Sequence, residues 1–201
     1  QVRVDKEDPS FKKPSKPIGP FYTKEEADAE AAKDGSTYVE DAGRGYRKVV
    51  PSPMPKEIVE KEAVRALVEA DVLTICSGGG GIPVVAEDGQ YVGVEAVNDK
   101  DFSARVLAEN VDADRLIILT GVDNIYINYN QPDQKALEQI SVAEAEEYIK
   151  EGHFAAGSML PKIEAALDFV KGDDKRKAII TSIENLENID KEAGTVISQK
   201  G

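Results

Sequence analysis

The sequence is poor in the residues that zinc sites and hydrolytic triads require. It contains a single cysteine, Cys76, and a single histidine, His153. One cysteine cannot form an internal disulfide and suits a reducing compartment, so we expect a cytoplasmic protein. Without a histidine pair or a cysteine cluster, the sequence indicates neither a structural zinc site nor a Ser-His-Asp hydrolase. We interpret Cys76 as a small buried side chain and His153 as a surface residue at a helix end.

Positive charge and long apolar runs are also scarce. The 201 residues carry 25 lysines and arginines against 38 aspartates and glutamates, which gives a net charge of −13. This balance argues against nucleic acid and anionic membranes as partners, because both reward a positively charged surface. No apolar run approaches the ~18 residues that a membrane-spanning helix needs. A few lysines gathered in one cleft can still bind an anionic small molecule.

From residue 56 to the end, helical and strand-like segments alternate. The segments 72–76 and 115–120 are almost continuously apolar, which is typical of strands buried on both faces. We therefore predict an α/β fold, a three-layer αβα sandwich around a mainly parallel central sheet. Ligands of such sheets bind at the carboxyl ends of the strands. This rule directs attention to the residues that follow positions 76, 97 and 120.

The first quarter of the chain has a different pattern. Residues 5–22 contain four prolines and predict an irregular, extended loop. Thr23 and Glu26 form a capping box that opens a helix ending near Gly35. Two short strands joined by a glycine turn follow. Residues 5–55 are therefore predicted to form a β-rich excursion with one helix.

Four consecutive glycines follow the predicted strand 72–76. Without side chains, their backbone N–H groups can wrap closely around an anion. The spacing does not match G-x-G-x-x-G, because Pro83 or Val84 stands where the third glycine would be, and the chain contains no Walker A motif. The loop therefore favours phosphate binding of neither common kind, and a flexible connection is the alternative. These glycines are Gly78, Gly79, Gly80 and Gly81.

Two lysines lie at predicted helix starts. Lys100 stands between Asp99 and Asp101 where one helix begins, and Lys162 falls one turn into a helix for which Ser158 is the N-cap candidate. A cation near the positive end of a helix is unfavourable unless an anion binds there. The two lysines and the glycine loop together indicate a polyphosphate site. A surface capping cluster is the alternative reading of Lys100.

The turn after the strand 115–120 contains Asp123, followed by Tyr126 and Tyr129. Tyrosines at such a turn line a base pocket or, as often, pack at a sheet edge. Phosphoryl transfer needs no histidine or cysteine, since it relies on positioning and on cations that offset developing charge. The scarcity of both residues is therefore compatible with a kinase.

Six segments occur in an order and at spacings that closely resemble the carbamate kinases of the amino acid kinase superfamily. The likeness runs over essentially all 201 residues. It implies the three-layer αβα fold and a homodimer, with a place in arginine metabolism. It also implies reversible phosphoryl transfer between carbamoyl phosphate and ADP, giving ATP and carbamate, with Mg²⁺ carried by the nucleotide. The segments are "SKPIGPFY", "VEDAGRGYRKVV", "GGGGIPVV", "DKDFSARVLAENVDAD", "LIILTGVDNIYIN" and "GSMLPK".

The resemblance also implies roles for particular residues. By motif match, Lys100 and Lys162 would neutralise the phosphoryl group in transfer, and Asp101 would hold these lysines and help to place the metal-bound nucleotide. Lys16 would belong to a protruding lid subdomain of residues 7–50. Residues 56–201 would form the nucleotide-binding α/β part.

Substrate and nucleotide contacts follow from the same resemblance. The glycines 78–81 would face the phosphoryl or carbamate side of the site, together with Lys16. Residues expected near the nucleotide are Asp123, Tyr126, Ser158, Met159 and Lys162.

Carbamate kinases have an N-terminal third that this sequence does not match. That part carries a Gly-Gly-Asn phosphate-binding loop, a second glycine loop and several strands. We therefore expect this chain to be a fragment, or one piece of a nicked enzyme, and to be inactive alone. Two other hypotheses stay open: a kinase of the same fold with another acceptor, and a non-catalytic fragment that only binds nucleotide. A dinucleotide-dependent oxidoreductase is disfavoured by the failed glycine motif and the lysine pair.

Overall fold

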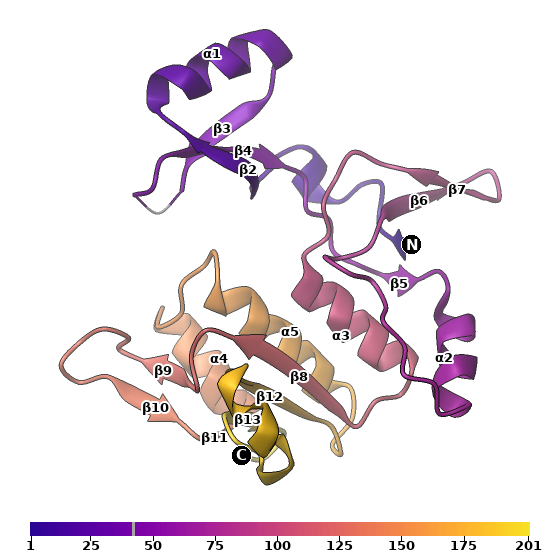
Figure 1. The fold of residues 1–201 in the computed structure, drawn as a ribbon, viewed down its shortest axis with the longest axis vertical. Helices are drawn as coiled ribbons and strands as arrows, with labels where there is room; N and C mark the ends of the chain where they lie inside the picture. The colour runs from indigo at the N-terminus through magenta and orange to yellow at the C-terminus, as the bar shows by residue number, and fades with distance from the viewer. Residues whose placement is uncertain (42) are drawn as a thin grey trace. The chain divides into compact units, whose positions relative to one another are not determined.

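The computed structural model describes every residue of the chain except Ala42, which belongs to the predicted glycine turn. The chain folds as two compact units, which are described separately below (Figure 1). The first unit comprises Gln1–Glu60 and Ile75–Ser103, and the second comprises Lys61–Thr74 and Ala104–Gly201. The boundary falls within α3 (Lys100–Asn110), so this helix contributes its first turn to the first unit. The predicted subdivision into residues 7–50 and 56–201 stays a prediction.

Among its described residues, the first unit contains a four-stranded sheet of order β5-β1-β6-β7 and a three-stranded sheet of order β2-β4-β3. β1 pairs parallel with β6, and the other pairings are antiparallel. The elements of this unit are β1 (Val2–Arg3), η1 (Pro9–Phe11), β2 (Lys16–Tyr22), α1 (Lys24–Asp34), β3 (Thr37–Glu40), β4 (Tyr46–Val50), β5 (Glu57–Ile58), β6 (Pro83–Glu87) and β7 (Gln90–Gly93).

Local sequence signals define several of these elements, and those at the two ends of α1 were predicted. Thr23 and Glu26 form the reciprocal capping box of α1, and Gly35 ends the helix in the left-handed conformation at φ +70°. The β6–β7 hairpin turns at Asp88 and Gly89, both with positive φ, as a two-residue hairpin turn requires.

The prediction of an irregular loop over residues 5–22 was wrong for its second half. Residues 16–22 form β2 despite Pro17 and Pro20. β2 is an edge strand, and its pairing with β4 shifts register between Ile18 and Tyr22. A proline is tolerated at an edge or a bulge, because its missing N–H is not needed there.

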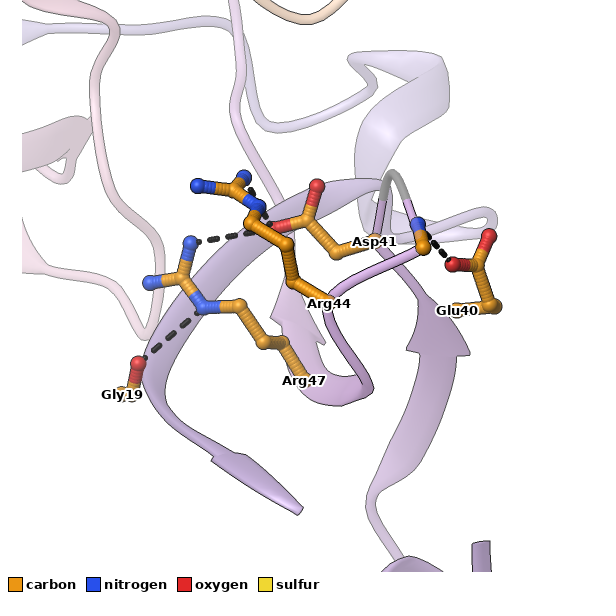
Figure 2. Close-up of polar contacts among 6 residues, drawn as sticks. Gly19, Glu40, Asp41, Arg44 and Arg47 are labelled. Atoms are coloured by element: carbon orange, nitrogen blue, oxygen red, sulfur yellow. Dashed lines mark hydrogen bonds and ion pairs between the residues drawn. The ribbon is translucent and has the colours of Figure 1, made fainter. Parts of the chain in front are cut away.

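Two arginines secure this irregular stretch of β2 (Figure 2). Arg47 Nε donates a hydrogen bond to the Gly19 carbonyl at 3.0 Å, and Asp41 Oδ2 lies 3.3 Å from nitrogens of both Arg44 and Arg47. Both guanidinium groups also lie over the ring of Phe21, 4.8 and 5.1 Å from its centroid. The hairpin β3–β4 is thereby fixed to β2 by side chains as well as by backbone pairing.

The second unit is built on a four-stranded sheet of order β11-β13-β12-β8. The β11–β13 and β12–β8 pairs are parallel, and the β12–β13 pair is antiparallel. A short antiparallel hairpin, β9–β10, was not predicted. The elements are α2 (Lys61–Glu69), β8 (Arg115–Thr120), β9 (Ile125–Ile127), β10 (Lys135–Leu137), β11 (Gln139–Ser141), α4 (Val142–Lys150), α5 (Met159–Lys171), β12 (Lys177–Ser182), η2 (Glu184–Lys191) and β13 (Thr195–Ser198).

The core of this unit lies where α5 packs on β12 and β13. Ile163 and Phe169 of α5, Ile180 of β12 and Ile197 of β13 have no exposed surface. Burying each such side chain contributes about 1.5–3 kcal/mol relative to leaving it in water. Over residues 1–41 and 43–201, none of the helices is long and apolar enough to cross a membrane.

Two predictions about apolar strands need correction. Residues 72–76 form no strand, and Leu73 and Ile75 are 98% and 96% exposed, because no described strand pairs with this segment. β8 was expected to be buried on both faces, yet it buries Leu116 and Ile118 and exposes about two fifths of Ile117. Apolar composition indicated where strands could form, but not which faces of those strands other parts of this chain would bury.

Gly194 precedes β13 and provides a test of packing in the second unit. Its φ is +124°, and a Cβ there would lie 2.6 Å from the Ile180 carbonyl oxygen and 2.6 Å from Thr181 Cβ. We expect Gly194→Ala to lower the free energy of unfolding by roughly 2 kcal/mol or more, since strain and steric overlap add. Gly157→Ala is the control, because Gly157 has open space around its Cα. Equal urea midpoints for the two variants would contradict this account.

Candidate functional site

In the first unit, the carboxylate of Asp99 joins elements that are far apart in the sequence. Its Oδ2 accepts a hydrogen bond from Lys16 Nζ, 2.5 Å away at the start of β2, and its Oδ1 accepts the backbone N–H of Asp101 at 2.9 Å. The Asp99 carbonyl accepts the N–H of Ser103 at 3.0 Å. Asp99 thus caps α3 and holds Lys16, the predicted lid lysine, near the predicted site at Lys100.

The environment of Asp99 keeps it charged. Only 14% of its side chain is exposed, and burial alone would raise the pKa of the carboxyl group. The hydrogen bonds from Lys16 and from the Asp101 backbone outweigh burial, so the pKa lies below the ordinary value. The ion pair with Lys16 is therefore present at neutral pH.

The predicted glycine loop bends sharply just before β6. At its inner end the backbone packs too closely for side chains: a Cβ on Gly80 would overlap the carbonyl of Asn98, and one on Gly81 would overlap the side chain of Val2. The outer glycines, 78 and 79, are exposed. Four loop residues have positive φ: Ser77 (+57°), Gly78 (+44°), Gly80 (+135°) and Gly81 (+78°).

The loop is fastened to the start of α3. The buried hydroxyl of Ser103 donates a hydrogen bond to the Gly80 carbonyl at 2.8 Å, and Gly80 also packs on the backbone of Asn98. Three stretches that were predicted separately, around Lys16, the glycine loop and Lys100, therefore meet within the first unit.

Lys100 and Asp101 occupy the first turn of α3, as predicted. Lys100 is exposed, whereas Asp101 is 7% exposed. The alternative reading as a surface capping cluster is correct in part, because Asp99 does cap the helix. It is incomplete, because the capping carboxylate is mostly buried and is paired with a lysine of β2.

In the second unit, a cavity of about 590 Å³ opens where β8 ends. Four of the five residues predicted to lie near a nucleotide line this cavity: Tyr126, Ser158, Met159 and Lys162. The other lining residues are Thr120, Gly121, Val122, Asn128, Tyr129, Gly152, His153, Phe154 and Ala155.

The walls of the cavity combine aromatic and apolar groups with a helix start. The rings of Tyr126 and Tyr129 lie 5.9 Å apart, and Met159 begins α5. Ser158 is the N-cap residue, as predicted, although its side chain makes no capping hydrogen bond. Lys162 adds an ammonium group in the first turn. Such a cavity suits a molecule that carries a flat ring and an anionic group.

His153 was interpreted as a surface residue, and the structure corrects this. It lines the cavity, only 20% of its side chain is exposed, and its Nε2 lies 3.0 Å from Glu151 Oε2. Its ring packs edge-on against Tyr148 with centroids 5.8 Å apart. A lone histidine after a helix carries no pattern that could have predicted this position.

Asp123 is the predicted nucleotide residue that does not line the cavity. Its Oδ1 accepts a hydrogen bond from Ser182 Oγ at 2.6 Å, which ties the turn after β8 to the end of the neighbouring β12. The structure thus gives Asp123 a role in shaping the turn that leads to Tyr126. Its contact with a nucleotide stays a prediction.

Within residues 1–41 and 43–201, no group of three or more histidine, cysteine, aspartate or glutamate side chains could hold a metal ion. The described side chains therefore form no ready-made metal centre. The prediction that Mg²⁺ arrives with the nucleotide is compatible with this arrangement but is not tested by it.

The chain was compared with known proteins. The model of the amino acid kinase family matches residues 23–182. A carbamate kinase of Lentilactobacillus hilgardii is 55% identical over 100% of this chain and 63% of its own length. Two structures of Giardia lamblia carbamate kinase superpose on 98% of this chain. The one bound to citric acid has a TM-score of 0.90 and 44% identity, with 62% of its chain covered. The one bound to AMP-PNP has a TM-score of 0.85 and 46% identity, with 63% covered.

These similarities extend over both units of the chain, although the chain spans only about 63% of the length of the first curated relative. They agree with the predicted αβα fold and with the family predicted from six short segments. The chain belongs to the amino acid kinase family, and the relatives that it resembles are named carbamate kinases.

Proposed function

We propose that the protein containing this chain transfers a phosphoryl group reversibly between carbamoyl phosphate and ADP, giving carbamate and ATP. The observation that carries this proposal is the similarity of the whole chain to proteins named carbamate kinase. In the reaction, an oxygen of the ADP β-phosphate forms the new P–O bond as the carbamate oxygen leaves phosphorus. A homodimer, a cytoplasmic location and a place in arginine metabolism stay predictions.

The cavity of the second unit is the proposed nucleotide site. A relative that is 46% identical binds AMP-PNP. In the present chain, Tyr126, Tyr129 and Met159 would contact the base, because flat apolar side chains favour stacking. Lys162 would contact the phosphates at the start of α5, where the helix dipole also favours negative charge. Mg²⁺ bound to these phosphates would offset charge as it develops.

The first unit would receive the second substrate. The exposed glycines 78 and 79 and the exposed Lys100 would bind its anionic groups. Lys16 is held by Asp99, so its ammonium group has a fixed place beside the start of α3. Asp101, in the same helical turn as Lys100, would help to orient that lysine. Preorganised cations of this kind stabilise charge in the transition state without reorganisation.

The two remaining hypotheses differ in the acceptor and in turnover. A kinase of the same fold for another acceptor would bind nucleotide in the same cavity and would bind a different second substrate at the glycine loop. A non-catalytic fragment would bind nucleotide without turnover, and the limited share of the relatives' length that this chain spans keeps that hypothesis open for the isolated chain.

ATP formation from ADP, Mg²⁺ and carbamoyl phosphate is the direct test. We expect activity from the complete gene product that carries this sequence and none from the 201-residue chain alone. Acetyl phosphate serves as the control donor. If the complete product makes no ATP from carbamoyl phosphate, carbamate is not its phosphoryl acceptor in the reverse direction. Other acceptors of the family are then assayed with ATP.

The roles of the two lysines predict large kinetic effects. In the complete gene product, Lys100→Ala and Lys162→Ala should each lower kcat by roughly 10²–10³-fold, because each removes charge stabilisation of the transferred group. Melting temperatures should change little, since both lysines lie in first helical turns outside the core. The control is Lys171→Ala, at the far end of α5, where the lysine pairs with Glu146 on the surface. A kcat for Lys100→Ala or Lys162→Ala within a few-fold of the control would remove that lysine from the mechanism.

The Lys16–Asp99 ion pair predicts that replacing Lys16 changes the pKa of the Asp99 carboxyl group. In Lys16→Met, the pKa of the Asp99 carboxyl should rise, because burial then acts with one hydrogen bond and one positive charge fewer to oppose it. The sign follows from the depressed pKa. The stability from ionised Asp99 is complete above the usual range for aspartate and is lost as pH falls through the folded pKa. Carboxyl ¹³C NMR of both proteins measures this, and identical midpoints would show that Lys16 does not stabilise the carboxylate.

A further inference from the structure

Asn98 carries a buried carboxamide for which the described part of the chain supplies no hydrogen-bond partner. The residue is 1% exposed, and neither its Oδ1 nor its Nδ2 has a hydrogen-bond partner among the residues that the structure describes. Leaving a buried polar group unpaired costs about 1–3 kcal/mol. Such groups are rare in native proteins, and each requires an explanation, such as an ordered water, stored strain or a role in function.

The position of Asn98 connects this amide to the glycine loop. Asn98 lies immediately before the capping residue of α3, and its Cβ is 3.4 Å from the place that a Gly80 Cβ would occupy. A second buried polar side chain beside the loop is Ser103, whose hydroxyl already donates to the Gly80 carbonyl. That hydrogen bond fixes the Gly80–Gly81 peptide group. Ser103 makes no such hydrogen bond to the peptide groups that precede Gly80 among those that the structure describes.

The loop itself does not yet present all its donors to a ligand. The N–H of Gly78 is bonded to the Cys76 carbonyl at 2.7 Å, and the N–H of Gly80 is bonded to the Ser77 carbonyl at 2.8 Å. A loop that cradles an anion must point such N–H groups outward. Rotating the Gly79–Gly80 peptide group would do this for Gly80, and glycines permit the rotation at low steric cost. The same rotation moves the Gly79 carbonyl, which then requires a donor of its own, and the buried amide of Asn98 lies beside Gly80.

We propose that Asn98 is a positioning residue for the glycine loop, whose buried Nδ2 donates to the Gly79 carbonyl when the loop binds an anion of the phosphate or carbamate class. The inference rests on the proposed function for the identity of that anion. Among the described residues the amide has no partner, and the Gly78 and Gly80 N–H groups bond within the loop. Anion binding exchanges the internal Gly80 N–H bond for one to the ligand, and Asn98 gains its partner in the same step.

Asn98→Leu separates this role from packing, because leucine has a similar volume and no polar atoms. In the complete gene product, we expect its KM for carbamoyl phosphate to rise about tenfold, which is the effect of one lost hydrogen bond. The KM for ADP should stay within about twofold. The melting temperature without ligand should stay equal or rise, because an unpaired buried amide is removed. Stability and substrate affinity are thus expected to move in opposite directions.

Thr181→Val is the matched control. Thr181 is also fully buried, its hydroxyl also has no partner among the described residues, and it lies in β12 of the second unit. We expect no loss of stability and an unchanged KM for carbamoyl phosphate. An unchanged KM in Asn98→Leu would overturn the proposal, and so would a lower melting temperature without a KM change, which indicates an amide that only holds a buried water.

A second pair of variants keeps the test valid if Asn98→Leu does not fold. Asn98→Ser and Asn98→Ala shrink the side chain to nearly the same size, but serine keeps a donor. The KM for carbamoyl phosphate should be lower in Asn98→Ser than in Asn98→Ala, and equal values would reject the proposal. If the wild-type protein makes no ATP from carbamoyl phosphate, the proposed function fails by itself. The effect of inorganic phosphate on the melting temperature then tests Asn98, with a smaller shift expected in Asn98→Leu than in wild type.

Discussion

In the first unit, the contact between β2 and the start of α3 depends on the mostly buried carboxylate of Asp99. Asp99 caps α3 with one oxygen and binds Lys16 with the other, across 83 positions of sequence. Both partners are donors, so they stabilise the ionised form of the group that desolvation opposes. Because α3 begins at this point, the same contact sets where the Lys100 side chain starts and where Ser103 can reach the glycine loop. The start of β2, the start of α3 and, through Ser103, the glycine loop are therefore positioned around a single residue.

Local chemistry made much of the fold predictable. The capping boxes at Thr23 and Ser141 and the Asp88–Gly89 turn act within four residues, so a sequence window contains all of their partners. The long-range features were not predictable in this way. β2 forms in spite of its prolines because β4 offers an edge, and the strand expected at 72–76 does not form because no described strand lies against it. Strand propensity states that a segment can pair, and only the rest of the chain supplies the partner.

The candidate site residues likewise divide into those with a local sequence signal and those that depend on long-range contacts. Lys100, Lys162 and the glycine loop were found because a cation or a bare backbone at a helix or strand end is unusual in any context. Asp99 was noticed only as a capping residue, since its lysine partner is remote, and His153 had no signal at all. The burial of Asn98 was equally hidden. An asparagine beside a charged cluster reads as a solvent-exposed loop residue, and only the packing of Gly80 against it shows otherwise.

A chain of net charge −13 needs local means to bind the anions proposed for it. At distances beyond the Debye length, about 8 Å at physiological ionic strength, the overall charge is largely screened. Within that distance, the first unit offers the N–H groups of a glycine loop, the start of a helix and two lysines, one of them fixed by Asp99. Backbone N–H donors carry no net charge, so a nearby carboxylate cannot cancel their effect by forming an ion pair with them. They depend instead on the conformation of the loop, which the Ser103 hydroxyl and the packing of Asn98 against Gly80 help to set.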